Sequence, residues 1–183
     1  MWEIQSEMKA KRAQESHILL SELMVPSFAN FGGSVHGGVL LSLMDKAAYV
    51  CASKFAEAYC VTVAVEGVEF LNPVKIGSIV NINAAVNFVG TTSMIVGMRV
   101  EALDPITSIT THTNSCYFTM AAKNPDGTLK RVPQLLVEGE TELRRWCEGH
   151  ALRELSKAKR SALKVSFESK TLKELTDYKN AHS

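Results

Sequence analysis

The chain is 183 residues long, which corresponds to about one domain with room for a buried core. Hydrophobic residues make up 46% and charged residues 21%, a composition typical of ordinary globular proteins. The net charge is only +1, which argues against nucleic acid as the main partner because phosphate binding usually requires a strong basic excess. No apolar run reaches the roughly 18 residues that span a bilayer.

Cysteine usage and the N-terminus predict a cytoplasmic protein. The first residues lack the basic-then-apolar layout of a secretory signal. The four cysteines lie far apart and form no C-x-x-C pair, so neither a disulfide framework nor a zinc site is expected. We therefore expect a reducing compartment, no metal and no bound cofactor.

The predicted elements begin with a strand over residues 17–25, which Pro26 ends. A loop containing four glycines follows over residues 27–38. Residues 39–58, rich in Leu, Met and Ala, predict a helix that is apolar on nearly every side and hence buried. Strand-like runs then follow at residues 60–70, 79–89, 93–103 and 108–121. This order predicts an α+β fold in which an antiparallel sheet curves round one central helix.

The composition changes once, near Glu138. Charged, helix-prone residues follow as far as Arg160, and a polar end runs from residue 161 to 183. Few large apolar residues occur in this end, so we expect part of it to be disordered. The predicted organisation is one domain over residues 1–137 and a helical extension over residues 138–183.

Asp45 is the first candidate for chemistry, because it lies in the middle of the predicted apolar helix. A carboxylate in apolar surroundings is costly unless it is paired or hydrogen-bonded. Such a group suits a general base or a nucleophile. The alternative is that Asp45 emerges at a polar seam or pairs with a neighbouring cation.

The glycine-rich loop before the helix is the second candidate. The first N–H groups of a helix lack intrahelical acceptors, so those near Gly37 and Gly38 could stabilise a developing oxyanion, such as that of an ester or thioester under attack. The alternative is a flexible connector. Asp45 lies eight residues beyond Gly37, about 12 Å along one helix, so a single carbonyl could not contact both. If both act on one carbonyl, two copies of the chain must share the site.

Two further segments carry polar groups. His36 could act as a base because histidine titrates near neutral pH, but we favour a structural role in the loop. The turn formed by Thr91, Thr92 and Ser93 is typical turn chemistry, although its hydroxyl groups could bind a polar substrate.

Short motifs from about Leu19 to Leu135 resemble those of a known family in their order and spacing. The motifs are Met24-Val25-Pro26, Asn30, Gly37-Gly38, Leu43-Met44-Asp45, Val65-Glu66-Gly67-Val68-Glu69-Phe70-Leu71-Asn72-Pro73-Val74, Gly77, Gly90-Thr91-Thr92-Ser93, Phe118-Thr119-Met120 and Asp126-Gly127. The chain resembles the acyl-CoA thioesterases of the hotdog fold, in the branch of the bacterial acyl-CoA thioester hydrolases and the cytosolic brain-type hydrolase.

This resemblance implies hydrolysis of acyl-CoA to a free acid and CoA by homodimers that often assemble as trimers of dimers. It implies that Asn30 and Asp45 are catalytic and come from opposite subunits. The backbone at Gly37 and Gly38 would polarise the carbonyl, and the segment of Thr91, Thr92 and Ser93 would lie near the substrate. His36 departs from the commoner Phe of this branch and leaves the acyl group open. The rivals are a hotdog hydratase or dehydratase that uses His36 and a non-catalytic acyl-CoA sensor.

Overall fold

The computed structural model describes residues 9–167 and 170–182. Its elements in chain order are β1 (Lys11–Arg12), α1 (Ala13–Ser16), β2 (Ile18–Leu23), the 3-10 turn η1 (Pro26–Phe28), α2 (Gly37–Ala56), β3 (Tyr59–Glu66), β4 (Ile79–Val89), β5 (Ser93–Leu103), β6 (Thr110–Lys123), β7 (Leu135–Leu136), α3 (Gly139–Phe167) and α4 (Leu172–Ala181).

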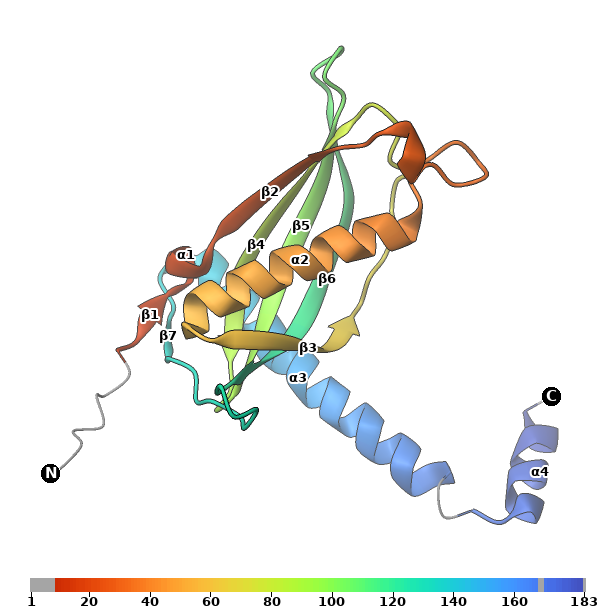
Figure 1. Cartoon of the computed structure of the whole chain (residues 1–183). Helices are drawn as coiled ribbons and strands as arrows, with labels where there is room; N and C mark the ends of the chain where they lie inside the picture. The colour runs from red at the N-terminus through yellow and green to blue at the C-terminus, as the bar shows by residue number, and fades with distance from the viewer. Residues whose placement is uncertain (1–8, 168–169, 183) are drawn as a thin grey trace, which may run out of the picture. The chain divides into compact units, whose positions relative to one another are not determined.

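Five strands form one antiparallel sheet in the order β2-β4-β5-β6-β3, and the helix α2 runs along its inner face (Figure 1). The predicted α+β architecture is therefore confirmed. Strand β3 ends at Glu66 rather than at residue 70, because Gly67 takes the left-handed conformation that stops extended pairing. Strands β2 and β3 are the two edges of this sheet.

Helix α2 forms where Leu, Met and Ala dominate, between defined caps. His36 caps its N-terminus, and Glu57 ends it in the left-handed conformation with φ of 48°. Its buried face contains Leu40, Leu43, Met44, Ala47, Ala48, Cys51, Ala52, Phe55 and Ala56. The prediction that the helix is buried all round is wrong for the single chain. One face of α2 is exposed, and it includes Ser42, Asp45, Lys46, Tyr49 and Val50.

The inner face of the sheet completes the core with alternating apolar residues. On β4, Val80, Ile82, Ala84 and Val86 are almost fully buried, while the residues between them face outward. This alternation is the period of two expected for a sheet with one face on the core. Each large apolar side chain buried here stabilises the fold by roughly 1.5–3 kcal/mol. The core thus holds α2, and with it Asp45, in a fixed position against the sheet.

Two compact units divide the chain after Gly149, inside α3. The first contains the sheet and α2, and the second, from His150, contains the rest of α3 and α4. The domain boundary expected at residues 137 and 138 stays a prediction, although α3 begins close to it, at Gly139. Much of the polar end is helical, and residues 168, 169 and 183 lie outside the described residues. In the part of the chain described, no helix combines the length and apolarity that crossing a membrane requires.

Candidate active site

Asp45 lies in the middle of the exposed face of α2, not in the core. The Thr62 hydroxyl of β3 donates a hydrogen bond of 2.6 Å to Asp45 Oδ1. In the single chain, Asp45 therefore emerges at a polar seam and does not pair with a described cation. The second carboxylate oxygen, Oδ2, accepts no hydrogen bond from a described residue, so it is available to a substrate or a water molecule.

A hollow of about 640 Å³ surrounds this carboxylate and is otherwise largely apolar. It is lined by Asp45, Lys46, Tyr49, Val50, Tyr59, Cys60, Val61 and Thr62. The rings of Tyr49 and Tyr59 meet edge to face, with their centroids 6.1 Å apart. The hollow lies beside β3, an edge strand whose Val63 and Val65 are also about half exposed. Exposed apolar surface next to an open sheet edge is typical of an interface.

Asn30 organises the loop before α2. Its Oδ1 accepts hydrogen bonds from the backbone N–H groups of Gly32 at 2.8 Å and Ser34 at 3.2 Å. Since only the oxygen of a carboxamide can accept, these two bonds fix which way the amide points. Its Nδ2 donates to no described residue. Asn30 is exposed and offers this N–H₂ group as a donor at the helix start.

At the start of α2, the two glycines that were predicted to bind the oxyanion differ in whether their N–H groups are free. His36 Nδ1 accepts from the Gly38 N–H at 2.9 Å, which confirms the structural role expected for His36. The Gly38 N–H is therefore engaged in the cap. The Gly37 N–H has no acceptor among the described residues and remains available to an oxyanion. The cradle of Gly37 and Gly38 stays a prediction, with Gly37 as its free donor.

The turn of Thr91, Thr92 and Ser93 lies toward the other end of α2. The Thr92 carbonyl accepts from Ala122 N, the Ala122 carbonyl accepts from Lys130 N, and Lys130 Nζ donates to Ala56 O. These bonds connect the turn to the last residue of the helix. Thr91 lines an open hollow of about 800 Å³ together with two cations, Lys9 and Arg131. Neither cation forms an ion pair with a described residue.

The single chain does not bring these groups together. Helix α2 is continuous from Gly37 through Asp45, so the two are about 12 Å apart along the axis. The hollow at the helix start, about 530 Å³, is lined by His36 and Gly38, among others, and shares Lys46 with the Asp45 hollow. The helix start, Asp45 and the 91–93 turn are thus three separate places on one chain.

Thr62 is a candidate residue that the sequence reasoning missed. Its signal is a single hydroxyl in an apolar run from Cys60 to Val65, on the strand that follows the helix. Pairing it with Asp45, 17 positions away, required the three-dimensional contact. Within residues 9–167 and 170–182, no group of three or more His, Cys, Asp or Glu side chains is placed to hold a metal ion.

Comparison with known proteins identifies the family. A family model described as the thioesterase superfamily matches residues 32–109. The protein VdlD of Helicobacter pylori is 42% identical over 134 residues, covering 73% of this chain and 76% of its own. The acyl-CoA thioester hydrolase YciA of Escherichia coli is 32% identical over 123 residues, covering 65% of this chain and 92% of its own. The chain belongs to the thioesterase superfamily. The resemblance drawn from the short motifs is therefore confirmed.

A longer relative matches over part of its length, and two solved structures agree with this chain in fold. The cytosolic acyl coenzyme A thioester hydrolase of mouse is 33% identical, but the match spans only 38% of that longer protein. An acyl-CoA hydrolase of Staphylococcus aureus, solved with butyryl coenzyme A, coenzyme A and coenzyme A disulfide, has a TM-score of 0.80 and 29% identity, with 87% of this chain and 97% of that chain covered. A hexameric acyl-CoA thioesterase has a TM-score of 0.79 and 30% identity over 85% and 99% of the chains.

Solved structures of the Staphylococcus aureus enzyme include three alanine variants. They replace an asparagine, an aspartate and a threonine. Along that chain the aspartate follows the asparagine by 15 residues, and the threonine follows the aspartate by 17.

Proposed function

We propose that this thioesterase hydrolyses acyl-CoA to a free carboxylic acid and CoA at a site shared between two subunits. The observation that carries the proposal is the hydrogen-bonded pair of Asp45 and Thr62 in an open hollow beside a free sheet edge. The Escherichia coli and mouse relatives are named acyl-CoA thioester hydrolases, and the mouse relative is also named cytosolic, so we place this protein in the cytoplasm.

The spacing of three residues supports this assignment. Asn30, Asp45 and Thr62 lie 15 and 17 positions apart, as do the asparagine, aspartate and threonine replaced in the Staphylococcus aureus enzyme. We propose that the same three residue types serve the reaction here. Thr62 acts as a positioning residue, because it contacts Asp45 rather than the reacting atoms.

The chemistry follows from the free atoms of the site. The Thr62 hydroxyl holds Asp45 Oδ1, which leaves Oδ2 to accept a proton from water as the water oxygen attacks the thioester carbonyl. The Nδ2 group of Asn30 and the Gly37 N–H donate to the developing oxyanion. The oxyanion then re-forms the carbonyl as the C–S bond breaks, and the CoA thiolate takes the proton that Asp45 holds, which restores the carboxylate. Direct attack by Asp45, through an anhydride that water hydrolyses, uses the same contacts and stays open.

A dimer brings the two halves together. Asp45 and the helix start are about 12 Å apart on one chain, whereas groups that act on one carbonyl must lie within roughly 3 Å of it. We propose that Asp45 of one subunit faces Asn30 of the partner subunit. The exposed Tyr49, Val50 and the free edge of β3 would be covered in this dimer. Since similar thioesterases are hexameric, we propose a trimer of such dimers.

The turn of Thr91, Thr92 and Ser93 would bind the distant part of the substrate. CoA carries phosphate groups, and Thr91 lines a hollow with Lys9 and Arg131, two cations that form no ion pair with any described residue. Cationic side chains and a hydroxyl are the groups that hold phosphate. We propose that this hollow receives phosphates of CoA and that the segment acts in substrate binding rather than in the chemical step.

Release of thiol from a panel of acyl-CoAs of different chain length tests the proposed activity. Free CoA must appear in step with free acid. Hydration of an enoyl-CoA without thiol release would favour the hydratase, although its expected base, His36, already uses Nδ1 in the helix cap. Tight acyl-CoA binding without turnover would favour the sensor.

A further inference from the structure

A β-bulge changes the outer face of the sheet, the face away from α2. Val86 pairs with Val96, and Phe88 pairs with Ile95, so Asn87 is an extra residue in β4. A bulge breaks the alternation of side chains and re-aims one of them. Phe88 contacts the ring of Trp146 on α3, with centroids 5.4 Å apart, and Asn87 points into hollows beneath the same helix.

Asn87 is a largely buried residue whose carboxamide lines both hollows and has no hydrogen-bond partner among the described residues. The residue is only 8% exposed, yet its side chain forms no hydrogen bond with any described residue. The two N–H donors and the oxygen of Asn87 are therefore free to bind a group that enters the hollow.

Two glycines make room for this arrangement. A Cβ on Gly97 of β5 would lie 2.1 Å from Asn87 Nδ2, so only glycine leaves space for the carboxamide there. A Cβ on Gly149 would lie 2.8 Å from the Cβ of Phe88, so glycine also allows α3 to approach the bulge. The resulting hollows measure about 480 Å³ and about 100 Å³ and share His17, Ala85, Asn87 and Arg145 in their linings. The larger one is within the usual size of small-molecule sites, roughly 300–1,000 Å³.

Basic side chains dominate the larger hollow. Arg99, Arg144 and Arg145 line it together with one carboxylate, Glu148. Arg144 forms an ion pair with Glu148, and Tyr117 donates to Glu148 Oε2 at 2.9 Å. Burial, followed by this contact with Glu148, raises the pKa of Tyr117 to about 12, so its hydroxyl remains a donor to the carboxylate. The charge of Glu148 is thus already engaged.

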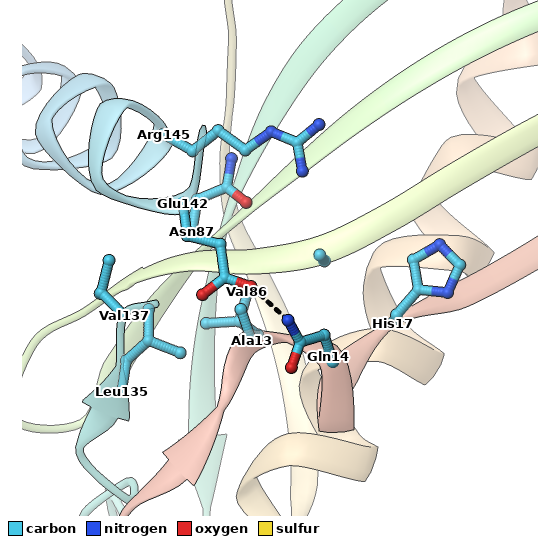
Figure 2. Close-up of a pocket in the computed structure, with 10 residues that line it drawn as sticks. Ala13, Gln14, His17, Val86, Asn87, Leu135, Val137, Glu142 and Arg145 are labelled. Atoms are coloured by element: carbon cyan, nitrogen blue, oxygen red, sulfur yellow. Dashed lines mark hydrogen bonds between the residues drawn. The ribbon is translucent and has the colours of Figure 1, made fainter. Parts of the chain in front are cut away.

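Arg145 is the cation that remains for a ligand. Arg99 pairs with Glu101 at 2.8 Å, whereas Arg145 forms no ion pair with a described residue. Figure 2 shows the Arg145 side chain extending across the hollow above the Asn87 carboxamide. Glu142 also lines the smaller hollow. Its carboxylate accepts a hydrogen bond of 2.8 Å from the Gln14 side-chain amide, which is drawn as the dashed line in Figure 2.

We propose that Asn87 and Arg145 form a binding site for the oxyanion group, phosphate or carboxylate, of a small molecule. The Arg145 guanidinium supplies charge and parallel donors, and Asn87 Nδ2 supplies neutral donors at the buried end. The site lies on the opposite face of the sheet from α2 and Asp45. It therefore stands independently of the proposed hydrolase activity.

Binding of simple anions to the full-length protein tests the proposal. Sodium phosphate and sodium acetate are titrated separately by calorimetry and by thermal melting, with sodium chloride at equal ionic strength as the reference. We expect saturable binding of at least one oxyanion and a matching rise in Tm. Arg145→Gln should weaken binding about tenfold or more, because it removes a charged hydrogen-bond donor. Asn87→Asp should abolish it, because a negative charge of the same shape faces the anion.

Each outcome decides the matter. Preference for phosphate assigns a phosphorylated ligand, and preference for acetate assigns a carboxylic acid. Lys173→Gln, which removes an exposed positive charge from α4, should bind as the unmodified protein does. Binding of both anions no better than chloride, or binding unchanged in Arg145→Gln, overturns the proposal. Arg145→Gln changes a side chain that forms no ion pair with a described residue, so this variant remains informative if Asn87→Asp does not fold.

Discussion

Replacing Thr62 by valine isolates the contact that positions Asp45. The substitution keeps the β-branched shape of an edge-strand residue and removes the hydroxyl that donates a hydrogen bond of 2.6 Å to Asp45 Oδ1. A hydrogen bond to a charged group contributes roughly 1.5–3 kcal/mol, which corresponds to about a 10- to 100-fold change in rate. Both side chains are exposed in the single chain, where water weakens the bond, so a value near the upper end would indicate that a partner subunit covers the pair.

Thiol release by Thr62→Val should therefore show kcat lowered by about 10- to 100-fold with KM nearly unchanged. Thr62→Ser, which restores the hydroxyl, should recover most of the loss. Thr119→Val on β6 is the matched control, because the Thr119 hydroxyl has no hydrogen-bond partner among the described residues. Unchanged kcat in Thr62→Val, or equal losses in Thr62→Val and Thr119→Val, would refute the positioning role.

The remaining predictions concern the shared site, the phosphates and the bulge. Asp45→Asn should abolish thiol release while calorimetry still detects CoA binding; turnover close to that of the unmodified protein would remove Asp45 from the mechanism. Asn30→Ala should lower kcat by about 10²–10³, as loss of an oxyanion donor does, and mixing it with Asp45→Asn subunits should restore part of the activity; exchange without recovery would reject shared sites. Arg131→Gln should raise KM for acyl-CoA but not for acyl-pantetheine, which lacks the nucleotide phosphates, and equal effects on both substrates would move the phosphates elsewhere. Gly97→Ala should destabilise the fold by about 1–3 kcal/mol in urea unfolding, because its Cβ would displace the Asn87 side chain; unchanged stability would show that Asn87 moves freely.

The fold was accessible from the sequence because its signals are local. The Leu-, Met- and Ala-rich run predicted α2 to within two residues at each end, and alternation with turn residues predicted the strands of the main sheet. The bulge at Asn87 left no such signal, because it depends on register against β5. Two-residue strands such as β1 and β7 are also too short to show a periodic pattern.

The candidate site was only partly accessible. Asp45 stood out as a charge in an apolar helix, and helix geometry alone separated it from Gly37. The apolar residue Val50 contributed to the prediction of a buried helix, but in the single chain it is exposed, because composition does not say which molecule covers a face. Thr62 and the engaged N–H of Gly38 are tertiary and capping contacts that spacing does not reveal.

The length of α2 has a consequence for how the activity depends on protein concentration. With the acid at its middle and the oxyanion donors at its start, an isolated chain would hold two half-sites, neither of which completes the reaction. Specific activity should then fall on dilution below the concentration at which subunits separate, and newly synthesised chains would become active only when they pair.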